Sequence, residues 1–93
     1  MLKVNEYFGG TVKSIALENT EGVATVGVME AGEYEFGTST VEHMTIVSGV
    51  LQVMLPGHTS WSFYHKGETF IVEKDVIFKV KAMEKVAYYC RYE

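Results

Sequence analysis

The chain has 93 residues, of which 47% are hydrophobic and 22% charged, with a net charge of −4 and a sequence pI of about 5.3. This hydrophobicity excludes a disordered chain, and the acidic balance argues against a general nucleic-acid binder, which needs a basic surface. The length predicts a single domain over residues 1–93 that buries roughly 60–68% of its unfolded surface.

Cysteine content and apolar runs set two further limits. Cys90 is the only cysteine, so no intramolecular disulfide and no cysteine zinc site of the usual spacing are possible. The first six residues lack the apolar run of a signal peptide, and no stretch approaches the ~18 apolar residues of a membrane span. We therefore expect a cytoplasmic protein without membrane contact.

Short runs with alternating apolar and polar residues follow one another along the chain. Residues 1–10 are mixed and end at the turn signal Gly9-Gly10. The runs after that turn lie at 11–17, 23–29, 32–38, 44–47, 50–55, 61–65, 69–72, 76–81 and 86–92. About eight or nine strands at this spacing, without a sustained helical period, predict an all-β fold closed into an antiparallel barrel or jelly roll.

The alternation also assigns faces within the predicted strands. In the first, Val12 and Ser14 lie opposite Lys13. In the last, Tyr89 and Arg91 lie opposite a face formed by Val86, Tyr88, Cys90 and Tyr92. Nothing near Cys90 would stabilise a thiolate, so we expect it to be a small buried apolar residue.

Two sequence blocks have the spacing of the paired cupin motifs. The first carries Glu42 seven residues before Gly49, and the second runs from residue 67 to Phe78. Metal-binding cupins have an H-x-H pair before the glutamate and a third histidine in the second block. Here those positions hold Phe36-Gly37-Thr38 and Phe78. The spacing thus resembles a cupin barrel, but a phenyl ring cannot replace an imidazole ligand, so we expect no bound metal.

An ordered set of segments carries a closer resemblance across essentially the whole chain. They are Asn5-Glu-Tyr-Phe8, Lys13-Ser14, Val26-Gly-Val-Met29, Gly32-Glu-Tyr-x-Phe-x-Thr38, Met44-Thr45 with Ser48-Gly49, and Cys90-Arg-Tyr92. With these segments the chain resembles the small bacterial pyrimidine/purine nucleoside phosphorylase family. It departs from the cupin pattern at Glu73-Lys74-Asp75, where the second block often has Pro-x-Gly.

The resemblance implies a metal-independent pentosyltransferase with orthophosphate as co-substrate and no cofactor. Orthophosphate would attack the anomeric carbon of a purine or pyrimidine nucleoside, releasing the base and ribose 1-phosphate. The resemblance also implies a homodimer. The alternative is a non-catalytic, metal-free cupin that binds a sugar or nucleotide-like molecule as a sensor or carrier, and a third reading is a small dimerisation module with an inert core.

For this chemistry the residue inventory offers an anion site and a catalytic group. Arg91, the sole arginine, is the first candidate for binding phosphate and Lys13 the second. Thr38, a candidate substrate-binding residue, and Ser48 could add hydroxyl donors. Glu42 is the candidate catalytic residue, which would bind ribose hydroxyls or stabilise positive charge on the sugar. Two alternatives remain open, since Arg91 could belong to the surface or a dimer interface and Glu42 could cap a turn.

The aromatic candidates are Tyr34, Phe36 and Phe78. Their rings could stack on a nucleoside base, and stacking without many base-edge hydrogen bonds would explain a broad specificity. At strand spacing, the same three rings could instead belong to the barrel core.

Overall fold

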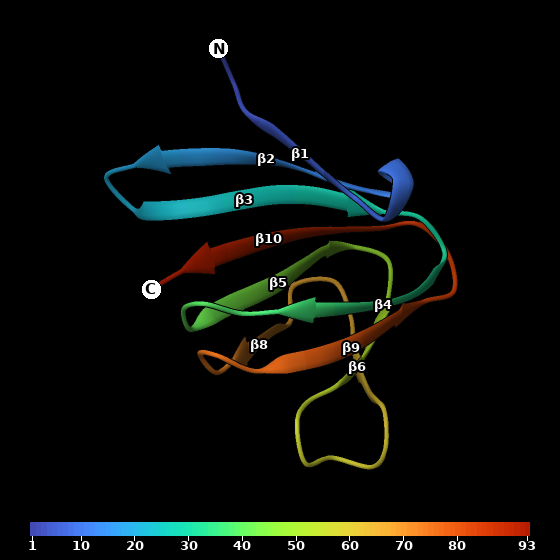
Figure 1. The fold of residues 1–93 in the computed structure, drawn as a ribbon. Helices are drawn as coiled ribbons and strands as arrows, with labels where there is room; N and C mark the ends of the chain where they lie inside the picture. Colours follow the sequence, from blue (N-terminus) through green and yellow to red (C-terminus); the bar gives the residue numbers. More distant parts are fainter.

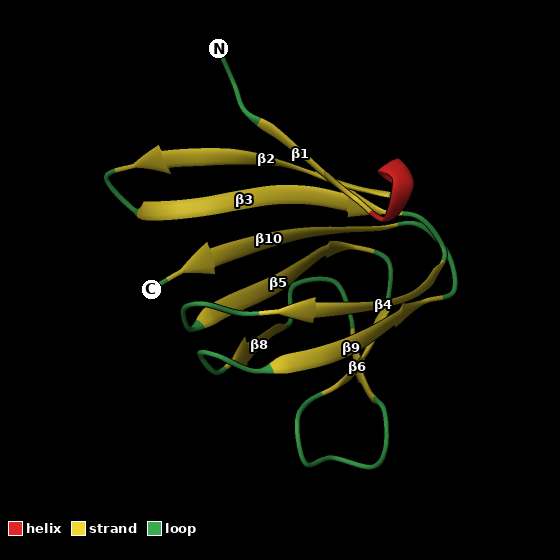
Figure 2. Cartoon of the chain, viewed as in Figure 1, coloured by secondary structure: helices red, strands yellow, loops and turns green.

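The computed structural model describes residues 1–93 and is built almost entirely of strands (Figures 1 and 2). The strands are β1 (Val4–Tyr7), β2 (Val12–Asn19), β3 (Gly22–Met29), β4 (Gly32–Gly37), β5 (Glu42–Ser48), β6 (Leu51–Met54), β7 (Ser62–Tyr64), β8 (Thr69–Val72), β9 (Ile77–Ala82) and β10 (Val86–Tyr92). The only helical segment is η1 (Phe8–Gly10), and the structure contains no candidate membrane-spanning helix. The predicted all-β class is confirmed.

The strands form two antiparallel sheets that face each other (Figure 1). The larger sheet has the order β1-β2-β3-β10-β5-β8, and the smaller has the order β4-β9-β6-β7. Consecutive strands often lie in different sheets, as in β4 and β5, so the chain crosses repeatedly between the layers. This arrangement is the predicted jelly-roll barrel, with the inward face of each strand contributing to one shared core.

The two ends of the space between the sheets are filled differently. At one end, aliphatic side chains from both sheets pack at no more than 2% exposure: Val12, Met29, Leu51, Val53, Val80, Ala82 and Val86. Strand register brings these residues together, since Val86 pairs with Met29 and Val53 with Val80. Toward the opposite end the inward side chains become aromatic and polar, and they leave a cavity.

Strand β1 and its turn were not predicted as a strand. The segment has apolar residues on both faces, so no period marks it, and its only strand partner is β2, with Tyr7 opposite Val12. In the turn after it, Phe8 has φ 51° and Gly9 has φ 68°. This left-handed conformation is unfavourable for residues other than glycine, so Phe8 is strained. The Phe8 ring packs against Phe36 at 5.5 Å, and this contact offsets part of the strain.

Candidate functional site

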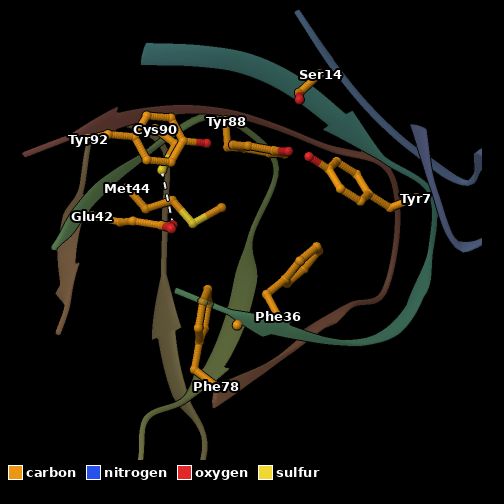
Figure 3. A pocket seen from close by; sticks show the side chains of 10 residues that line it. Tyr7, Ser14, Phe36, Glu42, Met44, Phe78, Tyr88, Cys90 and Tyr92 are labelled. Atoms are coloured by element: carbon orange, nitrogen blue, oxygen red, sulfur yellow. Dashed lines mark hydrogen bonds between the residues drawn. The ribbon is translucent and has the colours of Figure 1, made fainter. Parts of the chain in front are cut away.

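A cavity of about 200 Å³ lies between the two sheets at the polar end (Figure 3). Side chains from both sheets line it: Tyr7, Ser14, Phe36, Glu42, Met44, Phe78, Tyr88, Cys90 and Tyr92, with Gly37 at the end of β4. No lysine, arginine or histidine is among them. Its walls therefore combine hydroxyl groups, aromatic rings and one carboxyl group.

Glu42 provides the carboxyl group from the first position of β5. It is half-buried, and the Cys90 thiol of β10 donates a hydrogen bond of 3.4 Å to its Oε1 atom. Burial raises the pKa of Glu42, and the bond from Cys90 acts in the opposite direction. Burial and the neighbouring carboxylate also raise the pKa of Cys90, so it stays a neutral thiol donor. The expected buried character of Cys90 is confirmed, at 2% exposure.

Tyr92 adds a hydroxyl beside this pair. Its phenol oxygen lies 2.9 Å from the Thr25 hydroxyl of β3, and either group could donate. Burial raises the pKa of Tyr92, and the bond to Thr25 acts against that shift. The phenol therefore stays neutral beside Glu42.

The Tyr88 ring lies over Gly27 of the neighbouring strand β3, where there is no side chain. A Cβ atom at Gly27 of β3 would come within 2.4 Å of the Tyr88 ring, so only glycine leaves room for the ring there. The β10–β5 register also shifts between Ala87 and Tyr88, and such an irregularity re-aims side chains. Burial raises the pKa of Tyr88 to about 12, while the Ser14 hydroxyl acts in the opposite direction.

Three rings form the aromatic side of the cavity. Phe36 of β4 and Phe78 of β9 are cross-strand partners with ring centroids 5.9 Å apart. Tyr7 meets Phe36 edge-on at 6.4 Å and is 44% exposed, so it lies at the solvent side of the cavity. Figure 3 shows the Tyr7 hydroxyl directed toward that of Tyr88.

The structure brings three of the predicted site residues, Phe36, Glu42 and Phe78, to the cavity. Tyr34 shares their face of the sheet but does not line the cavity, and its hydroxyl donates to the Glu30 carbonyl at 2.7 Å. It packs beside Phe36, with centroids 6.3 Å apart, as a core residue would.

Thr38 has a structural contact instead of a place in the cavity. Its hydroxyl donates to the Glu73 carbonyl at 2.6 Å and accepts from the Val76 amide at 3.1 Å. These bonds join the end of β4 to the turn between β8 and β9. The hydroxyl is thus already engaged on both its donor and acceptor sides.

Lys13 and Arg91, the two predicted phosphate ligands, lie outside the cavity. Lys13 extends from the outer face of β2 and pairs with Glu6 at 3.3 Å in an exposed contact. Arg91 lies on the outer face of β10 opposite His43, one position from the inward Cys90. Because side chains alternate along a strand, both cations point to the outer face of the larger sheet, whereas the cavity lies on its inner face.

The sequence reasoning did not assign a role in the site to Tyr7, Ser14, Met44, Tyr88 or Tyr92, which all line the cavity. For the residues of β2 and β10 the signal was present, because alternation already grouped them with buried apolar neighbours. Tyr7 had no such signal, since its strand was not predicted.

The four positions that hold metal in metallo-cupins contain Phe36, Thr38, Glu42 and Phe78. The structure brings no three histidine, cysteine, aspartate or glutamate side chains together as a metal-binding group. Glu42 and Cys90 are the only two such side chains in the cavity. A resident metal in the barrel would thus have too few ligands of the usual kind.

Comparison with known proteins gives concordant results. Residues 2–92 match the family model described as pyrimidine/purine nucleoside phosphorylase. A curated protein of that name from Pseudomonas putida is 56% identical over 92 residues, which is 99% of this chain and 98% of the relative. A crystal structure of a protein of unknown function from Vibrio parahaemolyticus superposes with a TM-score of 0.96 at 41% identity, covering 100% of this chain and 99% of the other.

A more distant structure supports the fold. An RmlC-like cupin from Shewanella frigidimarina has a TM-score of 0.74 at 20% identity, covering 96% of this chain and 80% of its own. The predicted cupin architecture is therefore confirmed.

Proposed function

This chain belongs to the pyrimidine/purine nucleoside phosphorylase family, and we propose that it cleaves both purine and pyrimidine nucleosides with orthophosphate. The observation that carries the proposal is the family match over residues 2–92, which includes every residue that lines the cavity. The proposed products are the free base and ribose 1-phosphate.

In the proposed reaction a phosphate oxygen bonds to the anomeric carbon of the ribose as the glycosidic carbon–nitrogen bond breaks. The electron pair of that bond leaves with the base, whose nitrogen takes a proton. Positive charge develops on the sugar during this exchange, and a fixed negative group beside it lowers the barrier. Glu42 is the only carboxyl group lining the cavity, so we assign it this role and keep it as the proposed catalytic residue.

Broad base specificity is consistent with the aromatic side of the cavity. Phe36 and Phe78 offer ring faces and no hydrogen-bonding groups, and every base has a face that stacks. The cavity volume of about 200 Å³ is below the roughly 300–1,000 Å³ of typical ligand pockets. We therefore propose that the sugar occupies the cavity and that the base extends past Phe36 toward solvent.

The same cavity also fits the non-catalytic alternative, because it has no cationic side chain and one carboxyl group. Such a lining suits a neutral polyhydroxy ligand such as a sugar or nucleoside. A protein of this kind would bind nucleoside without needing phosphate, which makes the two functions separable.

The deciding experiment incubates the purified, chelator-treated protein with uridine or adenosine, with and without phosphate, and separates the products by chromatography. Free base and ribose 1-phosphate that appear only with phosphate would support the proposal and its metal independence. Activity that returns only when a divalent metal is added would contradict metal independence. Thermal stabilisation by nucleoside without turnover would instead support the binding protein.

We also propose a homodimer formed through the outer face of the larger sheet. Six aliphatic side chains on that face are 41–54% exposed: Val4, Ile15, Val26, Val28, Val47 and Ile71. A partner copy covering them would leave each cavity on the other side of the sheet, so each subunit would keep its own site. Sedimentation velocity should show a dimer for the native protein and a monomer for Val26→Lys combined with Val28→Lys. A native monomer at micromolar concentration would contradict this interface.

A further inference from the structure

We propose that the hydroxyl groups of Tyr7, Ser14 and Tyr88 bind the attacking phosphate. This assignment rests on the proposed function and names the part of the cavity that would hold the anion. It replaces the two cations expected from the sequence with neutral donors on β1, β2 and β10 of the larger sheet.

The three hydroxyls gather at one side of the cavity from β1, β2 and β10 (Figure 3). The Asn5 amide donates to the Ser14 oxygen at 3.4 Å, which leaves the Ser14 proton directed toward the Tyr88 phenol, whose pKa it lowers. Neither Tyr7 nor Tyr88 donates its phenol proton in any hydrogen bond of 3.5 Å or less to another side chain or carbonyl. Two phenol protons are thus available at one place, and the Ser14 hydroxyl lies beside that of Tyr88.

An anion on this side of the cavity would be separated from the only carboxyl group in the lining. Glu42 lies on a different side in Figure 3, and it is the weakest of the influences that raise the pKa of Tyr88. Because that pKa is about 12, Tyr88 keeps its proton and stays a donor over the working range of an enzyme. Hydrogen bonds to an ionised oxygen are roughly twice as strong as neutral ones, so hydroxyls alone can hold phosphate.

This placement would also suit a displacement at the anomeric carbon. In Figure 3 the hydroxyls lie above the open space, Phe36 and Phe78 lie below it, and Glu42 borders it. A sugar beside Glu42 would then have phosphate on one side and the base on the other. Attack and departure on opposite faces of the sugar require this order.

Gly27 acts through Tyr88 as a positioning residue. The Tyr88 ring occupies the space that a side chain at residue 27 would fill, at a distance of 2.4 Å from an added Cβ atom. A methyl group there would displace the ring and move its hydroxyl away from Ser14 and Tyr7.

The test replaces Tyr88 with phenylalanine, which removes one hydroxyl and keeps the ring. We expect the KM for phosphate, and the dissociation constant for inorganic phosphate alone measured by calorimetry, to rise about 10-fold to 100-fold. The KM for the nucleoside should stay within about twofold, as expected when one substrate loses a contact and the other does not. Tyr64→Phe is the matched control, since that ring packs on Phe70 at 4.7 Å and lies outside the cavity.

Gly27→Ala provides a second variant that removes no hydroxyl. It should reproduce the phosphate defect of Tyr88→Phe, and circular dichroism will show whether the variant is folded. If it does not fold, the Tyr88→Phe result decides.

Two outcomes would overturn the inference: an unchanged phosphate dissociation constant in Tyr88→Phe, or a rise in the nucleoside KM in its place, which would assign the hydroxyls to the sugar. Failure of the proposed function is distinguishable, because it is an absence of phosphate-dependent base release by the native protein. A native protein that binds phosphate through Tyr88 without turnover would support this site and contradict the reaction.

Discussion

The two faces of β10 differ in composition and in what they contact. The inward face carries Tyr88, Cys90 and Tyr92, which are neutral polar groups whose pKa values burial raises. The outward face carries Tyr89 and Arg91, which pair across the sheet with Thr45 and His43. Successive residues therefore alternate between a cavity wall and an outer surface that continues into the exposed aliphatic residues.

This difference shows that the chemistry of the cavity depends on the face of the strand to which each side chain points, more than on which residue types the chain contains. Arg91 is the only arginine and so the first candidate for binding an anion, yet it lies next to the inward Cys90 and therefore points to the outer face. The larger sheet thus separates two proposed roles, with ligand binding on its inner face and association on its outer face.

The largest expected effect is on stability, where inner and outer aliphatic residues of one sheet can be compared. Leu51→Ala removes a side chain with 0% exposure and should lower the free energy of unfolding by about 2–5 kcal/mol. Ile77→Ala, at 61% exposure on the outer face of the same sheet, should change it by less than about 0.5 kcal/mol. Urea denaturation measures both, and similar losses would remove the distinction.

A second comparison concerns the adjacent residues Glu42 and His43, which face opposite sides of β5. Glu42→Gln keeps the size of the side chain but removes the negative charge beside the sugar, so kcat/KM should fall about 100-fold. His43→Gln breaks a contact with Glu93 on the outer face and should leave kcat/KM within about twofold. Equal activity of Glu42→Gln and the native protein would exclude a catalytic role for this carboxylate.

The pH dependence should report the burial of Glu42. Burial raises its pKa above 4.5, so the carboxylate forms only as the pH rises through that higher value, and activity should decline on the acid side at a pH above 4.5. Glu42→Gln should lack this decline, and phosphate, which also titrates, affects both proteins equally. An identical acid limb of kcat/KM in both proteins would assign it to another group.

The raised pKa of Glu42 also affects the stability of the folded protein. A salt-bridged carboxylate stabilises the native state when it is ionised, whereas the buried Glu42 carboxylate should destabilise it. Because the folded-state pKa is raised, the charged form of Glu42 destabilises the native state above that pKa, and the cost disappears as the pH falls through it. Glu42→Gln should therefore gain stability relative to the native protein at neutral pH and lose that advantage in acid.

The smallest effects are expected from the two cations on the outer face. Arg91→Met and Lys13→Met keep much of the aliphatic length, and neither native side chain lines the cavity. The KM for phosphate should therefore remain within about twofold of the native value. A tenfold or larger rise in either variant would restore the phosphate role expected from the sequence and contradict the proposed division between the faces.

Much of the fold was predictable because strand alternation and glycine turns are local signals. The faces of β2 and β10, the buried state of Cys90, and the position of Phe36 opposite Phe78 all follow from these signals and the cupin spacing. The same alternation already grouped Arg91 with Tyr89, away from the apolar face, so its outward direction was also contained in the sequence.

Other parts of the site depend on contacts between distant segments. Tyr7 reaches the cavity because β1 pairs with β2 and a left-handed turn follows it, and its mixed sequence does not reveal either feature. Tyr34 and Thr38 share a face with Phe36, but their hydroxyls bond to Glu30 and Glu73, which alternation cannot anticipate. Likewise, the need for glycine at residue 27 can be recognised only when the Tyr88 ring is known to pack against it.

The position of β1 at the border of the larger sheet has a consequence for motion. The strand pairs with β2 alone and contains no fully buried residue, whereas β10 is held between β3 and β5. Local opening costs least where few buried contacts are lost. The amides of β1 should therefore exchange with deuterium well before those of β10, which would make the wall that bears Tyr7 the less protected of the two.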